Sequence, residues 1–125
     1  MAKITVPFDY DVPANTRINL TTSAFEKGTF VYDGWPHFRA GCENLVRFYL
    51  YEVSVDEIAN DEDPEKYGVS LINKKGDSRD YVVGENIRKP VRISRNVNKG
   101  NRLCVSLYNT DSFSHKISVD LEIEV

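Results

Sequence analysis

The segment with the greatest capacity for chemistry runs from Tyr32 to Gly41 and reads Tyr-Asp-Gly-Trp-Pro-His-Phe-Arg-Ala-Gly. Tryptophan, tyrosine and arginine anchor many binding interfaces, because they bury a large area with little loss of rotamer entropy and still offer polar tips. Two glycines and a proline predict that the segment is a loop. We therefore expect a partner-binding site made of Tyr32, Trp35, His37, Phe38 and Arg39. The alternative left open is that Trp35 and Phe38 plug one end of the core.

No other residues have the spacing of a catalytic or metal site. The two histidines, His37 and His115, belong to no nucleophile elbow and no zinc-binding pattern. Cys42 follows His37 by five positions, but no third, orienting group can be named for a cysteine nucleophile. The chain is therefore expected not to be an enzyme, with no catalytic residue, no cofactor and no bound metal.

An acidic stretch lies between Asp56 and Glu65. Its carboxylates could bind calcium, but they lack the alternating pattern and the glycine of an EF-hand loop. A solvated loop is the favoured interpretation. The two cysteines, Cys42 and Cys104, are far apart in sequence and predict two half-buried free thiols, with a single bridge as the open alternative.

Length and charge set broad limits. The 125 residues match one domain, 1–125, which can bury a core without metals or disulfides. The net charge of −3 argues against a partner that is nucleic acid or an anionic membrane. No apolar run reaches the roughly 18 residues of a membrane span, and the first residues lack the apolar region of a signal peptide. The chain is thus expected to be made in the cytoplasm.

The last residues, 115–125, show the clearest structural pattern. Every second residue is aliphatic, and these positions are Ile117, Val119, Leu121, Ile123 and Val125. Alternation with a period of two predicts a β-strand that has one buried face and one face in water. Such half-buried strands are typical of antiparallel sheets that cover a core.

Shorter strands are expected at residues 3–8, 17–21, 29–32, 44–55, 69–72, 81–83, 91–94 and 101–108, with turns at 12–16 and 74–77. The last of these strands is predicted to form a hairpin with residues 115–125. Residues 56–68 are expected to be an exposed loop, with one helical turn at 55–60. The pattern predicts an all-β, antiparallel, two-sheet β-sandwich that is jelly-roll-like, although it does not give the strand order.

Two parts of the chain also carry a family resemblance. Val-Pro-Ala-Asn-Thr and the alternating strand after it, from Val12 to Leu20, together with the segment from Leu103 to Val119, resemble the small β-sandwich accessory proteins of virions. These include head-decoration, capsid-auxiliary and fibre-base domains of tailed phages. The resemblance covers about a quarter of the chain. It implies a non-enzymatic protein that assembles on a shell, often as a trimer, and it transfers no site residue.

Two functions from different classes follow. The first is a structural or assembly protein of a virion, a homo-oligomer that binds its own subunits and a capsid shell. The second is a carbohydrate-binding module or lectin, in which Tyr32 and Trp35 stack on sugar rings and Asp33, His37 and Arg39 supply polar contacts. The expected absence of a leader favours the first function.

Overall fold

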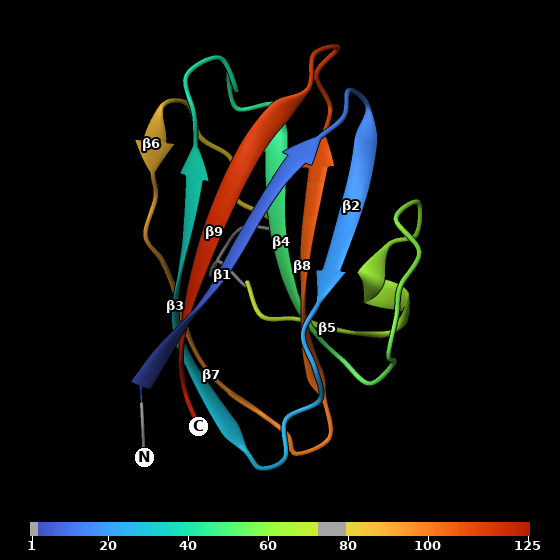
Figure 1. The fold of residues 1–125 in the computed structure, drawn as a ribbon, viewed down its shortest axis with the longest axis vertical. Coiled ribbons are helices and arrows are strands. Elements are labelled where there is room, and N and C mark those ends of the chain that lie inside the picture. Colours follow the sequence, from blue (N-terminus) through green and yellow to red (C-terminus); the bar gives the residue numbers. More distant parts are fainter. Residues whose placement is uncertain (1–2, 73–79) are drawn as a thin grey trace.

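The computed structural model describes residues 3–72 and 80–125, and these residues form an all-β sandwich (Figure 1). The elements, in chain order, are β1 (Lys3–Val12), β2 (Thr16–Thr21), β3 (Thr29–Phe38), β4 (Val46–Val53), the 3-10 helix η1 (Pro64–Lys66), β5 (Gly68–Ser70), β6 (Ile87–Arg88), β7 (Val91–Val97), β8 (Arg102–Asn109) and β9 (His115–Glu124). No helix among the described residues is long and apolar enough to span a membrane.

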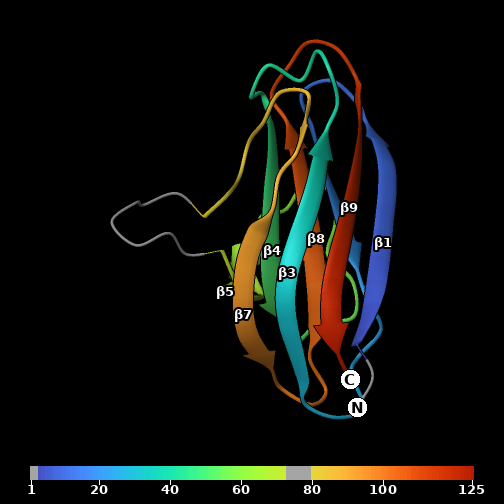
Figure 2. The ribbon, with the colours of Figure 1, turned by 90° about the vertical axis from the view of Figure 1, so that its left-hand side faces the viewer.

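Two antiparallel sheets make up the sandwich. Sheet A has the order β1-β9-β3, and both β6 and β7 pair with the far side of β3. Sheet B has the order β2-β8-β4-β5. Successive strands cross from one sheet to the other along β1 to β4 and again along β7 to β9, which is the connectivity of a jelly roll. Figure 2 looks onto sheet A, where β7, β3, β9 and β1 lie side by side in front of β4 and β8.

The main core lies between the two sheets, where the alternation of the strands directs their aliphatic residues. All four aliphatic residues predicted to face inward within β9 are buried, and Leu121 has no exposed surface. From sheet B, Phe48, Leu50 and Leu107 are equally buried against them. Because every second residue of these strands points inward, the two sheets share one apolar layer.

A second, smaller core covers the opposite face of sheet B. Its buried members are Tyr49, Tyr51, Val53, Ile58 and Cys104. The segment between β4 and β5, which contains η1, lies over them (Figure 1). Two ion pairs hold this segment to the sheet, Arg17–Asp63 at 3.5 Å and Arg102–Asp56 at 2.9 Å. Both faces of β4 are consequently buried, as the dense apolar sequence of residues 44–55 predicted.

One open edge of sheet A belongs to β1, which pairs with β9 along all ten of its residues. Pro7 stands in the middle of this strand. A proline has no N–H to give to a ladder, and within a sheet it fits where its nitrogen faces an unpaired edge. The edge also presents Lys3, Asp9 and Asp11, all exposed.

Several predicted elements differ from the structure. β8 and β9 do not form a hairpin, because β8 lies in sheet B and β9 in sheet A, and residues 110–114 connect the two sheets. The helical turn is at Pro64–Lys66 and not at 55–60, since the Asp63 side chain caps the N–H of Glu65 and a proline begins the turn. The predicted strand at 81–83 is a single bridge between Val82 and Phe48. The turn predicted at 74–77 lies outside the described residues.

Candidate functional site

The segment predicted to be a binding loop is a strand. Residues 32–38 belong to β3, which lies between β9 on one side and β6 and β7 on the other. Gly34 faces inward, where an added Cβ would lie 3.4 Å from Leu121 Cδ2. Pro36 falls between the residues of β3 that pair with β7 and those that pair with β6, so its missing N–H interrupts no ladder there. The loop prediction was therefore wrong.

A β-bulge brings the aromatic residues of β3 to the same side. The register with β9 shifts between Val31 and Asp33, so that Tyr32 is an extra residue without its own partner. Tyr32 and Trp35 are three positions apart, yet both point away from sheet B, because the bulge resets the alternation. We call this side of the sheet the outer face of sheet A.

The five predicted site residues do not stay together. Tyr32, Trp35 and His37 lie along the outer face of sheet A and are partly buried. Arg39 is exposed just beyond the end of β3, where its Nη2 donates to Ser118 Oγ at 3.2 Å. Phe38 was wrongly placed in the site: it points into the main core and has no exposed surface. The structure thus retains four of the five residues as candidates.

Trp35 lies at the centre of the outer face and is covered by an arginine. The guanidinium carbon of Arg88 stands 4.8 Å from the centroid of the Trp35 ring. The Nη2 of Arg88 also pairs with Asp120 Oδ2 at 3.0 Å. Around these groups lies a shallow hollow of about 210 Å³, which Thr5 and Glu122 complete. Cation–π contact and ion pair together fix the arginine over the ring.

Tyr32 is held in a similar way. Its hydroxyl donates to Glu124 Oε2 at 2.9 Å, and the Nζ of Lys3 stands 4.5 Å from the centroid of its ring. Lys3 in turn pairs with Glu122 Oε1 at 2.6 Å. The hydrogen bond to Glu124 raises the pKa of Tyr32, because a phenolate there would face a carboxylate. The hydrogen bond to Glu122 raises the pKa of Lys3, and the ammonium form is favoured.

The aromatic and charged side chains of this face are held mainly by one another. The faces of both aromatic rings carry a cation, so neither presents the open surface on which a sugar ring stacks. The carboxylates and cations of the face are largely paired with one another. The outer face of sheet A offers a pre-organised surface with arginine and aromatic anchors at its centre, features that lower the cost of protein association.

The two thiols and the partly buried pair of His115 with Asp111 lie elsewhere. Cys42 belongs to the main core and Cys104 to the smaller core, and both are free and fully buried, so the thiols are more buried than predicted. Burial raises the pKa of Cys42, and it raises the pKa of Cys104 to about 11. His115 Nε2 lies 2.7 Å from Asp111 Oδ2. Among the residues of 3–72 and 80–125, no three histidines, cysteines or carboxylates gather as a metal site would require.

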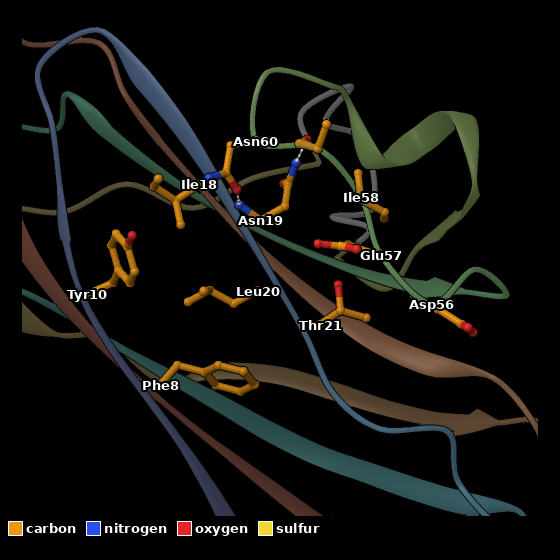
Figure 3. A pocket seen from close by; sticks show the side chains of 11 residues that line it. Phe8, Tyr10, Ile18, Asn19, Leu20, Thr21, Asp56, Glu57, Ile58 and Asn60 are labelled. Carbon is orange, nitrogen blue, oxygen red and sulfur yellow. Dashed lines mark hydrogen bonds between the residues drawn. The ribbon is translucent and has the colours of Figure 1, made fainter.

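A groove of about 720 Å³ lies beside β2 (Figure 3). Phe8 and Tyr10 of β1 line one side of it and residues 56–60 the other. Asn19 holds residues 56–60 against β2, since its Nδ2 donates to the carbonyl of Ala59 at 2.7 Å and its N–H donates to Asn60 Oδ1 at 2.9 Å. The groove shares no residue with the outer face of sheet A.

Residues that sequence reasoning missed complete the candidate site. They are Lys3, Arg88, Asp120 and Glu122, which come from β1, β6 and β9. The alternation of residues 115–125 already placed Asp120 and Glu122 on the solvent side of their strand. The pairing of β9 with β3, which brings these carboxylates beside Trp35, leaves no local signal in the sequence.

No protein-family model matches the chain, and no curated protein matches it.

Proposed function

We propose that this chain is a non-enzymatic assembly protein of a virion, which contacts other protein subunits through the outer face of sheet A. The observation that carries the proposal is the anchor at the centre of this face, Trp35 held under Arg88. Tryptophan and arginine are the residues most enriched among those that dominate the binding energy of protein interfaces. The ion pair with Asp120 keeps the anchor in place before a partner arrives.

The fold supports the same proposal. The two faces of sheet B are already covered, one by sheet A and the other by the segment between β4 and β5. Jelly rolls occur in viral capsid proteins and in lectins. Carbohydrate binding on this face is the weaker alternative, because Lys3 and Arg88 occupy the ring faces of Tyr32 and Trp35.

The test is the variant Trp35→Ala, studied by sedimentation velocity over a range of concentrations. We expect the variant to stay folded, since Trp35 lies on the surface side of the sheet, and to associate at least about tenfold more weakly than the parent. Phe113→Ala is the matched control. Phe113 is an aromatic residue with 71% exposure in the connection between β8 and β9, away from the proposed contact.

Three results would contradict the proposal. An unfolded Trp35→Ala variant would show that the residue is part of the core. Equal effects of Trp35→Ala and Phe113→Ala would remove the anchor from the interface. Loss of retention on a polysaccharide column, with association unchanged, would establish the lectin alternative. The virion location is tested separately, by whether particles purified from the source contain the chain in a fixed number of copies.

A further inference from the structure

We infer that the face of sheet B that points away from sheet A carries a second protein-binding site, in which Arg47 binds a carboxylate from an acidic segment of a partner protein. The inference goes beyond the proposed function, because it concerns the other sheet and uses none of the residues around Trp35. It comes from two arginines and three tyrosines that lie together on this face, namely Arg17, Arg47, Tyr49, Tyr81 and Tyr108. We call them the tyrosine–arginine cluster.

The sheet register gathers three members of the cluster in one row. Arg17 of β2 is opposite Tyr108 of β8, and Tyr108 is opposite Arg47 of β4. These strands lie side by side in sheet B (Figure 1). The residues next to this row in the same strands, such as Ile18 and Leu107, are buried in the main core. Alternation therefore directs the three members of the row away from sheet A.

Two tyrosines extend the cluster along β4. Tyr49 follows Arg47 by two positions and so lies on the same face. The bridge between Phe48 and Val82 brings Tyr81 beside it, with the two ring centroids 5.4 Å apart. The segment between β4 and β5 lies over this face, yet Arg47 and Tyr81 stay partly exposed. A partner can therefore reach the cluster from solvent.

The guanidinium of Arg47 is held by all three tyrosines. Its carbon lies 4.6 Å from the ring centroid of Tyr81 and 5.9 Å from that of Tyr108. Its Nη1 donates to Tyr49 Oη at 3.5 Å. Aromatic rings attract a cation through their quadrupole and leave its charge in place. The arginine is thus positioned before a ligand binds, which lowers the cost of binding.

Arg47 has no counter-charge within the described part of the chain. Among residues 3–72 and 80–125, no carboxylate lies within 4.0 Å of its guanidinium. Arg17 differs, because its Nη1 pairs with Asp63 Oδ1 at 3.5 Å. A guanidinium has five N–H donors, and the bond to Tyr49 uses one of them. The described residues therefore leave one positive charge and several donors of the cluster to a ligand.

The single remaining charge selects the ligand. It matches a carboxylate, which carries one negative charge and accepts two parallel hydrogen bonds from a guanidinium. A phosphorylated side chain carries up to two negative charges and is held by clusters of arginines. Arg17 does not complete such a cluster, because Asp63 already neutralises it.

The packing of the rings favours a protein over a sugar acid as the source of the carboxylate. A sugar stacks on an open ring face. Here Tyr81 lies against Arg47 and Tyr49, and Tyr108 lies against both Arg17 and Arg47. Tyrosine and arginine are enriched at protein interfaces. The ligand that fits is therefore an aspartate or glutamate side chain of a partner protein.

The test uses a fluorescein-labelled hexaglutamate peptide, whose binding is followed by fluorescence anisotropy. We expect the parent to bind it and not to bind hexaglutamine, the uncharged control peptide. Because the chain has a net charge of −3, general attraction cannot produce this binding. Arg47→Gln should raise the dissociation constant for hexaglutamate at least about tenfold. Arg47→Lys keeps the charge but loses the planar pair of donors, and it should raise the constant by a smaller factor.

Arg92→Gln is the matched control. Arg92 is an exposed arginine of β7 in sheet A, so its replacement removes the same charge far from the cluster and should leave the dissociation constant unchanged. Circular dichroism spectra and thermal unfolding check that the variants fold.

If Arg47→Gln does not fold, the parent alone still tests the inference. Phenylglyoxal modifies accessible guanidinium groups, and mass spectrometry of the digested chain locates the modified arginines. Hexaglutamate should protect Arg47 from this reaction and leave Arg92 unprotected. Equal modification of Arg47 with and without the peptide overturns the inference.

Three further results overturn it. The first is a parent that does not bind hexaglutamate. The second is an equal effect of Arg47→Gln and Arg92→Gln, which would assign the binding to overall charge. The third is tighter, Arg47-dependent binding of inorganic phosphate or of trigalacturonate, measured by competition with hexaglutamate, which would assign the site to a phosphate or to an acidic sugar. The proposed function stands or falls separately, because it is tested by association through Trp35.

Discussion

The substitution Leu121→Ala tests the sandwich at its centre. Leu121 is fully buried in β9, and its partner residues in the sheet are Gly34 on one side and Val6 on the other. Gly34 has no side chain with which to fill a void, and its backbone is fixed by pairing with two strands. The site therefore has little freedom to collapse after the leucine is shortened.

The expected cost has two parts. Removing about three buried methyl or methylene groups loses about 2.4 kcal/mol of transfer free energy, at about 0.8 kcal/mol for each. A remaining void of the order of 60 Å³ adds about 1.4 kcal/mol, at about 24 cal/mol per Å³. We expect Leu121→Ala to lower the free energy of unfolding by about 4 kcal/mol.

The neighbouring substitution Glu122→Ala is the matched control. The Glu122 side chain is 31% exposed and pairs with Lys3, whose side chain is 55% exposed. Exposed ion pairs contribute less than about 1 kcal/mol, because water screens them. Both variants can be compared by urea denaturation, followed through the fluorescence of Trp35, the single tryptophan. Equal losses for the two variants would refute the register of β9 and, with it, the assignment of its buried face.

Three further predictions concern other parts of the molecule. Gly68→Ala should destabilise the fold by more than about 2 kcal/mol, because the Cβ of the new alanine would overlap the backbone carbonyl of Glu52. Gly28→Ala is the control and should be tolerated, because its Cβ would meet no atom within 4 Å. Thermal unfolding compares the two variants. Thiol titration should find two thiols per denatured chain and almost none in the native chain, since Cys42 and Cys104 are buried; a count of zero that reductant restores would reveal a disulfide. The N–H groups of Glu43 and Gly41 lower the pKa of Glu85, and the hydrogen bond to His115 lowers the pKa of Asp111. Both carboxylates therefore stabilise the fold at pH values above their ordinary pKa, and that stabilisation is lost as the pH falls below about 4. Urea denaturation from pH 7 to pH 3 should show a smaller loss of stability for Glu85→Gln than for the parent. An identical loss in the two proteins would exclude Glu85 as a cause.

The sequence predicted the parts of the fold that depend on local pattern. The alternation of residues 115–125 was sufficient to identify β9 and its buried face, because the polarity of each residue indicates whether its side chain faces the core or water. The turn predicted at residues 12–16 is also confirmed, with Asn15 in the left-handed region at φ 53°. The two-sheet sandwich follows from many such short strands.

The candidate site could be predicted only in part, because its geometry depends on distant residues. Glycine and proline in residues 32–41 indicated a loop, yet both fit a strand here. Gly34 leaves room for the side chain of Leu121, and Pro36 lies in the gap between the residues that pair with β6 and those that pair with β7. Phe38 could not be separated from Trp35 as long as residues 32–41 were taken for a loop, because the two residues lie on opposite faces only through the alternation of strand β3. The contact of Arg88 with Trp35 joins residues more than fifty positions apart, and no local period reports it.

Pro7 at the open edge of sheet A limits how this protein can polymerise. An unpaired strand of ten residues is a template on which further strands could add without end, as in cross-β fibrils. A proline in its middle removes one donor from the ladder that each incoming strand would need, and the exposed Lys3, Asp9 and Asp11 add charge to the same edge. Linear growth through strand addition is thereby suppressed. A contact between two faces is not limited in this way, because it ends once the two surfaces have met.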